Sequence, residues 1–213
     1  MQRAFRILAV LTFITVGLMA CSPQGKDAKS LNDEGINLIK KGQYDEAIAK
    51  LSQAIQSDPK YAIAYDNRGL AEYLNKSYDK ALTDFNKAIE LNPKIAGAYY
   101  YRGLITLRTK DYNKAIADYS KAIELNPKFV VAYNNRGMAY YRINDYDKAI
   151  ADFSKAIELD PKLAQAYNNR AFAYFQKKDY SKAEEDVKKA QALKYEVPKE
   201  LLENLRGAGG GKK

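Results

Sequence analysis

A segment of 34 residues repeats along most of this chain and limits what the chain can fold into. The fourth copy, 130–163, reads VVAYNNRGMAYYRINDYDKAIADFSKAIELDPKL. A fixed period of this length is typical of stacked supersecondary units that bury their apolar faces against one another. Counted from Ala28, the chain contains five copies, which span 28–61, 62–95, 96–129, 130–163 and 164–197.

Each copy carries the pattern of two helices. Apolar or small residues mostly fall at positions 4, 8 and 11 and again at 20, 24, 27 and 28, the spacing of one helix face twice over. Polar residues or glycine separate the two runs at positions 15 and 16, as Asn144 and Asp145 do in the fourth copy. Position 32 is proline in four copies, and the residue before a proline avoids helical geometry. The second helix should therefore end by position 30 or 31.

Position 8 carries an unusual residue for the middle of a helix. It is glycine in four copies and Ala171 in the fifth. Glycine inside a helix costs about 1 kcal/mol relative to alanine, so its recurrence indicates that two helices press close together there. We expect the alanines at position 20 to face this contact, namely Ala47, Ala81, Ala115, Ala149 and Ala183.

Charged residues recur in the same register. Position 7 is arginine and position 23 is aspartate in the second to fifth copies, as in Arg136 and Asp152. The first copy has Glu34 and Lys50 instead, so both signs are reversed together. We predict a partly exposed ion pair between the two helices of one copy. Pairing with the following copy fits worse, because it would bring Lys50 against Arg68.

These residues resemble the signature of the tetratricopeptide repeat family. That signature has a small residue at position 8, aromatic residues near 11 and at 24, alanine at 20 and 27, and proline at 32. The match covers 28–197, about four-fifths of the chain, and its local departures are Leu31, Leu51, Glu72, Thr106 and Tyr195. The resemblance implies an all-α fold, a right-handed α-solenoid of five helix-turn-helix repeats.

The repeats are followed by one more short helical pattern. Pro198 starts it, Leu201, Leu202 and Leu205 give it an apolar face, and Gly207 is expected to stop it. We expect 198–206 to be a C-terminal capping helix that covers the last repeat, and 207–213 to be a disordered tail.

The first twenty residues have the pattern of a signal peptide, with two arginines before a short apolar run. Leu18-Met19-Ala20-Cys21 resembles the lipobox of bacterial lipoproteins, in which the peptide is cut before the cysteine and the cysteine is acylated. We therefore predict a lipoprotein signal peptide at 1–20, lipidation at Cys21 and a short linker to residue 27. By resemblance to enterobacterial lipoproteins, Ser22 favours the outer membrane, facing the periplasm. The alternatives are an ordinary signal peptide with an incidental cysteine, or an uncleaved anchor.

The composition argues against an enzyme. The chain has no histidine and one cysteine, and its acidic residues largely follow the repeat without metal-ligand spacing. We expect no catalytic residue, no metal and no cofactor. The formal net charge is +9, but the periodic lysines alternate with aspartate and glutamate. A solvated face is therefore favoured over a nucleic-acid surface.

In the resembling family, positions 2, 5, 6, 9, 12 and 13 line a concave groove that binds peptides or helices. The resemblance thus implies a protein or peptide partner. The asparagines at position 6 resemble the asparagine ladder of O-linked GlcNAc transferase, whose amides hold a peptide backbone. Alternatively, these amides bond a neighbouring helix, and the position 9 residues pack between adjacent first helices. We predict a groove made of Asn67, Tyr100, Tyr101, Arg108, Asn134, Asn135, Met138, Tyr141, Arg142, Asn168, Asn169 and Phe172.

Taken together, these patterns predict a membrane-anchored scaffold or adaptor that binds a partner protein in the bacterial envelope. The alternative is a structural module of an envelope assembly that associates with itself.

Overall fold

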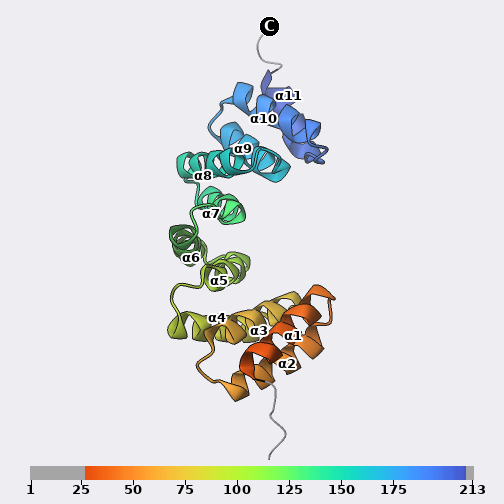
Figure 1. Cartoon of the computed structure of the whole chain (residues 1–213). Helices are drawn as coiled ribbons and strands as arrows, with labels where there is room; N and C mark the ends of the chain where they lie inside the picture. The colour runs from red at the N-terminus through yellow and green to blue at the C-terminus, as the bar shows by residue number, and fades with distance from the viewer. Residues whose placement is uncertain (1–26, 210–213) are drawn as a thin grey trace, which may run out of the picture.

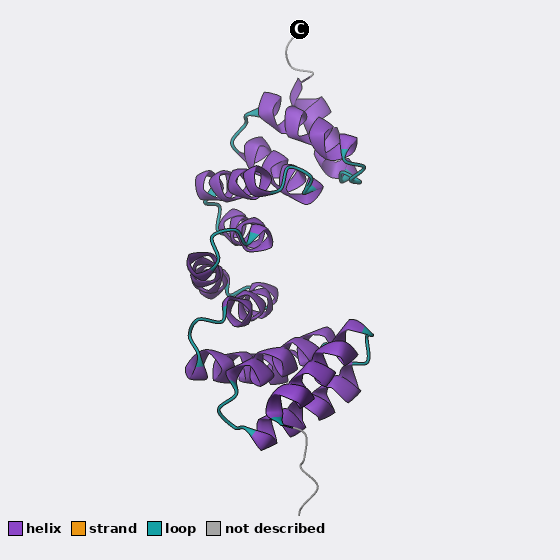
Figure 2. Ribbon diagram, in the orientation of Figure 1, coloured by secondary structure: helices purple, strands orange, loops and turns teal. Residues whose placement is uncertain are grey.

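The structure, a computed structural model, describes residues 27–209. Within this range there are eleven helices and no strand, so the predicted all-α class is confirmed (Figure 2). The first helices of the five repeats are α1 (Ala28–Lys40), α3 (Ala62–Leu74), α5 (Ala96–Arg108), α7 (Val130–Arg142) and α9 (Ala164–Gln176). The second helices are α2 (Tyr44–Ser57), α4 (Tyr78–Leu91), α6 (Tyr112–Leu125), α8 (Tyr146–Leu159) and α10 (Tyr180–Ala192), and α11 (Lys199–Gly209) follows them.

The helix pairs stack into an elongated solenoid, with α1 and α11 at opposite ends (Figure 1). Each second helix packs on its own first helix. The second helices of the first four repeats also pack on the first helix of the next repeat. The first helices also contact one another from repeat to repeat, which places them along one common side. The core is accordingly a series of small clusters at successive interfaces.

The turns form where the sequence pattern predicts them. Position 15 has a left-handed backbone in every repeat, with φ between 62° and 75°. The second helices of the first four repeats end at position 30, before the proline, as predicted. In three repeats an aspartate at position 16 caps the second helix by accepting a hydrogen bond from the backbone N–H of position 19.

The glycines at position 8 lie under a large side chain from position 24. A Cβ at Gly137 would lie 2.7 Å from Phe153, and the other three glycines stand in the same relation to Leu51, Phe85 and Tyr119. This side chain was not named from the sequence, and the prediction that the position 20 alanines face the contact stays a prediction. Those alanines are buried, but the nearest atoms belong to the longer side chain one turn further on. The fifth repeat has Ala171 at position 8 and the smaller Val187 at position 24.

The predicted ion pairs are present within single repeats. In the second to fifth repeats, arginine Nε and Nη2 donate to both oxygens of the aspartate at 2.6 to 3.0 Å. Lys50 and Glu34 form the reversed pair at 3.3 Å. The aspartate side chains are only 4% to 8% exposed, so these pairs are more buried than the sequence prediction held.

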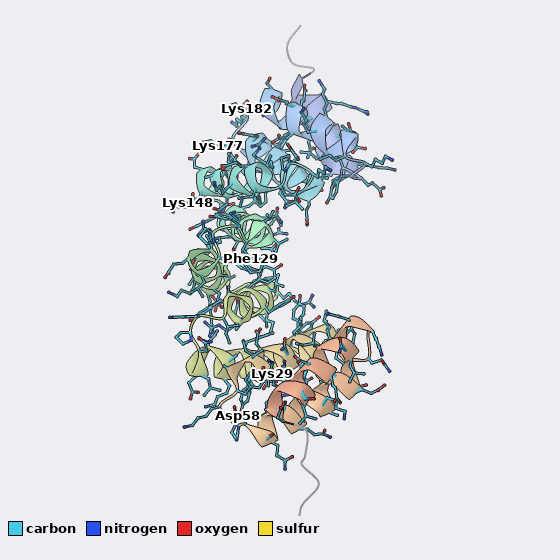
Figure 3. All side chains as sticks on the ribbon, in the orientation of Figure 1. Lys29, Asp58, Phe129, Lys148, Lys177 and Lys182 are labelled. Carbon is cyan, nitrogen blue, oxygen red and sulfur yellow. The ribbon has the colours of Figure 1, made fainter. Side chains whose placement is uncertain are left out.

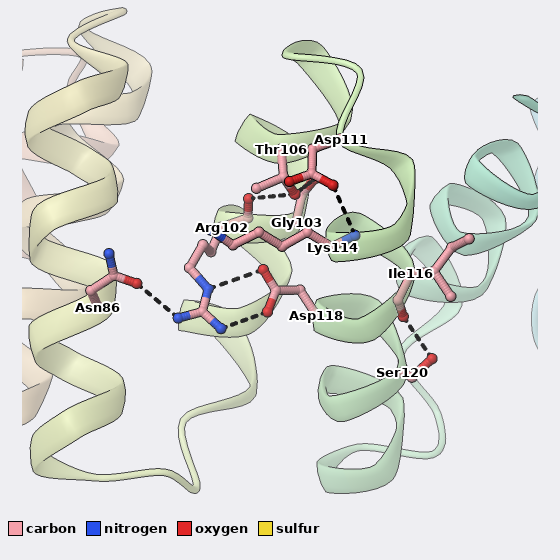
Figure 4. A network of polar contacts seen from close by, with 9 residues as sticks. All are labelled: Asn86, Arg102, Gly103, Thr106, Asp111, Lys114, Ile116, Asp118 and Ser120. Atoms are coloured by element: carbon pink, nitrogen blue, oxygen red, sulfur yellow. Dashed lines mark hydrogen bonds and ion pairs between the residues drawn. The ribbon is translucent and has the colours of Figure 1, made fainter.

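Each of these arginines also bonds the preceding repeat. Nη1 of Arg102 donates to Oδ1 of Asn86 at 2.8 Å while the rest of the guanidinium binds Asp118 (Figure 4). The other three arginines reach a serine at the same position 25, at 2.9 to 3.0 Å. The arginine therefore connects two repeats as well as two helices.

Surface lysines are paired with nearby acids. At position 26, Lys87, Lys121 and Lys155 bind the glutamate three residues later at 2.6 to 2.7 Å. Lys148, Lys177 and Lys182 lie along one edge of the solenoid, and each binds an aspartate (Figure 3). The periodic positive charge is thus partly neutralised on the surface.

The C-terminal helix α11 packs against the fifth repeat. Leu201 and Leu205 are buried there beside Val187. The predicted stop at Gly207 is wrong, because the helix continues to Gly209 and so shortens the predicted tail. Gly207 lacks the left-handed backbone that ends many helices, and a helical glycine alone costs only about 1 kcal/mol.

Two predicted segments lie outside the described residues. These are the signal peptide with Cys21 and the linker up to residue 26, and the last four residues of the chain. Asp27 is described and caps α1 by accepting a hydrogen bond from the N–H of Ser30 at 2.6 Å. Between residues 27 and 209, no helix has both the length and the apolar character needed to cross a bilayer.

Candidate functional site

Three adjoining hollows run along the solenoid from α4 to α11, and we call them together the α5–α11 groove. The first hollow, about 390 Å³, is lined by Tyr78, Ile105, Arg108 and Thr109. The second, about 400 Å³, is lined by Leu107, Arg108, Lys110, Tyr112, Met138 and Arg142. The third, about 300 Å³, is lined by Met138, Tyr141, Arg142, Asn169, Phe172 and Glu200.

Neighbouring hollows share their walls. Arg108 lines the first and the second, while Met138 and Arg142 line the second and the third. The shared residues come from α5 and α7, two first helices that pack on each other. In Figure 1, α5 and α7 lie on the same side of the solenoid, with α6 on the other.

The third hollow brings together five predicted groove residues. Met138, Tyr141, Arg142, Asn169 and Phe172 form all of its lining except Glu200. Sequence reasoning missed Glu200 because α11 is outside the repeat, so the register of the repeats says nothing about where it docks. Apolar and aromatic walls with a few polar groups are typical of a binding pocket.

The groove arginines have free hydrogen-bond donors. Arg108 lies with its guanidinium carbon 4.5 Å from the ring centre of Tyr78, a cation–π contact. Arg142 is exposed, and within residues 27–209 neither arginine is paired with a carboxylate. Both are therefore available to an external anion.

Three of the predicted groove asparagines are buried instead of open to a partner. Asn134, Asn168 and Asn169 are 3%, 4% and 8% exposed. The prediction that all three line an open groove is wrong for Asn134 and Asn168, whereas Asn169 does line the third hollow. The register of a single repeat does not show how closely position 5 is covered by the rest of the solenoid.

The position 6 amides bond the preceding repeat. Nδ2 of Asn67 donates to Oδ1 of Asn32 at 2.8 Å, and Nδ2 of Asn135 donates to the Tyr100 hydroxyl at 3.1 Å. Asn169 donates to Asn134 in the same way. The alternative that these amides bond a neighbouring helix is therefore confirmed for all three.

Tyr100 and Tyr101 belong to an aromatic cluster at the middle of the solenoid. Tyr100 contacts Phe129 and Tyr119, and Tyr101 stacks on Phe85 with ring centres 5.8 Å apart. Burial raises the pKa of Tyr100 to about 12, so its hydroxyl stays protonated at neutral pH. These two residues are half-buried and chiefly join repeats to one another.

Asp66 occupies the place that asparagine holds in three other repeats. It sits at position 5, and its Oδ1 is buried with no hydrogen-bond partner among the described residues. Burial raises the pKa of its carboxyl to about 6. Elsewhere in residues 27–209, no three His, Cys, Asp or Glu side chains are grouped to hold a metal ion.

An all-helical stack of repeated helix pairs defines the class of α-solenoid repeat proteins. Models described as tetratricopeptide repeat match residues 32–94 and 130–163, and a third matches both 85–117 and 153–185. A TPR repeat model matches 107–144. Together these matches run without a gap from 32 to 185, and the chain belongs to the tetratricopeptide repeat family.

Solved structures of two named proteins are among those that share this fold. MamA 41-end from Desulfovibrio magneticus RS-1 is 25% identical, with a TM-score of 0.72 over 80% of this chain and 96% of that one. A crystal structure of MamA is 27% identical, with a TM-score of 0.69 over 75% and 94%. YrrB, described as a TPR protein with an unusual peptide-binding site, is 25% identical, with a TM-score of 0.68 over 78% and 86%. No curated protein matches the chain.

Proposed function

We propose that this protein is a membrane-anchored scaffold or adaptor that holds a peptide or partner protein in the α5–α11 groove. The tetratricopeptide repeat fold supports a role in protein–protein interaction, and YrrB is described as having a peptide-binding site. The observation that carries the proposal is the third hollow, where Met138 and Phe172 offer apolar surface beside the free donors of Arg142. The family is generally non-catalytic, and the proposal assigns no reaction to this chain.

Binding in the groove can be tested by capture of partners from a bacterial envelope extract. Met138→Glu places a charge in the wall between two hollows, so it should abolish capture of any protein that binds there. Lys128→Glu is the matched control, because Lys128 is exposed on a loop outside the groove. A partner retained equally by wild type and Met138→Glu would contradict the proposed site.

The membrane anchor is the second part of the proposal and rests on the lipobox-like residues that end in Cys21. Acylation would attach the N-terminal end of the solenoid to a bacterial membrane, which we propose to be the outer membrane facing the periplasm. Each buried methylene of an acyl chain adds about 0.8 kcal/mol to membrane binding. Cys21→Ser should abolish metabolic labelling with palmitate, and unchanged labelling and fractionation would contradict the anchor.

Self-association is the alternative use of the groove. Light scattering of the chain without residues 1–21 tests it, because a mass that rises with concentration favours a self-associating module. A constant monomer mass contradicts that alternative.

A further inference from the structure

The uneven charge of the α5–α11 groove indicates the chemistry of its partner, an inference that rests on the function proposed above. Arg108, Lys110 and Arg142 supply three positive charges to the first two hollows, and no carboxylate lines either of them. The only acidic residue in the groove is Glu200, which lines the third hollow. Such a distribution favours an anionic ligand over α5 and α7 and disfavours one beside α11.

The two arginines are the local feature that sets this groove apart from the rest of the solenoid. Arg108 and Arg142 are the last residues of α5 and α7, at position 13 of adjacent repeats. The other three repeats have Lys40, Leu74 and Gln176 there. A cation at a helix C-terminus is stabilised by the helix dipole, and this accounts for tolerance of an arginine at each place. The helix dipole does not account for the placement of two exposed guanidinium groups in one shared hollow, the second.

The spacing of the arginines sets the spacing of the charges that they can bind. Packed helices lie about 8–10 Å apart, and a ligand in the polyproline II conformation advances about 3.1 Å per residue with about three residues per turn. Side chains three residues apart in such an extended ligand therefore share one face and match equivalent positions on adjacent first helices. Arginine also binds carboxylates in a planar, two-pronged geometry that lysine lacks.

The third hollow adds an apolar requirement. Met138, Tyr141 and Phe172 line it, and methionine adapts its shape to different apolar groups. Glu200 in the same lining opposes a further acidic residue there. We therefore propose that the partner is an extended acidic polypeptide segment with two carboxylates about three residues apart, followed towards α11 by a large apolar side chain.

A single-stranded nucleic acid fits the groove less well. Its backbone carries a phosphate at every nucleotide, so it would meet Glu200 with a further negative charge. A polypeptide can place an apolar residue at that point instead.

The test uses the full chain, fluorescent peptides and anisotropy at low salt. The first peptide carries two glutamates three residues apart with a phenylalanine on each side of them, so that it fits the groove in either chain direction. The second has the same composition with the glutamates adjacent, and the third replaces both glutamates by glutamine. We expect the first peptide to bind about tenfold more tightly than the other two, because each exposed ion pair contributes modestly. Raising the salt concentration should remove most of that difference.

Variants separate this inference from the proposed function. Arg108→Gln with Arg142→Gln should remove the advantage of the first peptide, whereas Lys128→Gln with Lys162→Gln makes the same change of charge on exposed loops and should keep it. Equal binding of the glutamate and glutamine peptides to wild type would overturn the acidic partner but leave a peptide groove in place. Tighter binding of a single-stranded oligonucleotide would overturn the choice of a polypeptide. Absence of binding by all three peptides would count against the proposed function as well.

Discussion

The side-chain amide of Asn169 donates a hydrogen bond to Oδ1 of Asn134, 3.0 Å away, across the interface between the fourth and fifth repeats. One repeat later, Oδ1 of Asn168 occupies the acceptor position, and it is buried with no partner among the described residues. In the second, fourth and fifth repeats, position 6 thus donates to position 5 of the repeat before, and the position 5 acceptor of the last repeat is left without a donor among the described residues.

Removal of the Asn169 amide should destabilise the fold. Asn169→Ala leaves the buried Oδ1 of Asn134 without its donor, which costs about 1–3 kcal/mol. Thermal or urea unfolding should show this loss, while Gln165→Ala on the exposed side of the same helix should change stability little. Equal stability of Asn169→Ala and wild type would show that the bond between repeats contributes nothing.

The pair formed by Arg136 and Asp152 should contribute more than a surface ion pair. Arg136→Glu leaves a buried carboxylate beside a second acid and breaks the bond to Ser120, so we expect a loss of about 2–4 kcal/mol. Adding Asp152→Lys should recover part of it, because Glu34 and Lys50 form this reversed pair naturally. Recovery stays incomplete because lysine at position 23 restores no donor for Ser120. Strictly additive losses in the double variant would rule out a direct pair.

The effects on stability of substitutions at Gly137 and at Phe153 should depend on each other. Alanine at 137 gains helix propensity of about 1 kcal/mol but collides with a fully buried ring, so Gly137→Ala should lower the melting temperature. Combining it with Phe153→Val reproduces Ala171 and Val187 of the fifth repeat. The second substitution should therefore cost less in the Gly137→Ala background than in the wild type, and independent effects in a double-mutant cycle would contradict the contact.

Asp66 should make stability depend on pH in an unusual direction. Its pKa in the fold is about 6, above the ordinary value of 3.8, so between these values the folded chain binds more protons than the unfolded chain. The contribution of this carboxyl to stability is full below pH 3.8 and is lost as the pH rises through 6. Asp66→Asn should therefore raise the free energy of unfolding at pH 7 by on the order of 2 kcal/mol. Urea unfolding at pH 7 and below pH 4 measures this, and a gain that is the same at both would argue against a raised pKa.

Tyr119 carries a buried hydroxyl without a partner among the described residues. Its equivalents in the neighbouring repeats are Phe85 and Phe153, which fill the same place without a polar atom. Tyr119→Phe should therefore stabilise the chain by about 1 kcal/mol, and Phe153→Tyr should destabilise it by a similar amount. Urea unfolding of both variants checks the two signs. Loss of stability in Tyr119→Phe would indicate that the hydroxyl has a bound water or another partner.

Most of the fold was predictable from the repeat register. A contact within one repeat occurs five times in the sequence, so its residues can be compared between copies. The reversal of sign at Glu34 and Lys50 indicated the ion pair within a repeat. The same register also contained evidence for the hydrogen bond from each position 7 arginine to position 25 of the preceding repeat. Position 25 is serine or asparagine in the first four repeats and the exposed Lys188 in the fifth, where no repeat follows.

The candidate site was less predictable, because it depends on how repeats sit against one another. The burial of Asn134 follows from the close approach of the next first helix, which the spacing within one repeat does not determine. Glu200 reaches the third hollow only through the docking of α11, a helix outside the periodic pattern. The residues of α7 and α9 that line this hollow were predicted because they occupy positions 6, 9, 12 and 13, which line the groove in the resembling family.

The bond from each arginine to the preceding repeat has a consequence for how the chain can lengthen. A middle repeat such as 130–163 carries both the arginine that reaches back and the serine that receives the next arginine. Tandem duplication or excision of one whole middle repeat therefore leaves an arginine and its acceptor at position 25 on the two sides of every junction. A repeat appended after the fifth would instead bring its arginine against Lys188. The arginine contacts thus favour lengthening of this protein by duplication of a middle repeat over addition of a repeat at the C-terminal end.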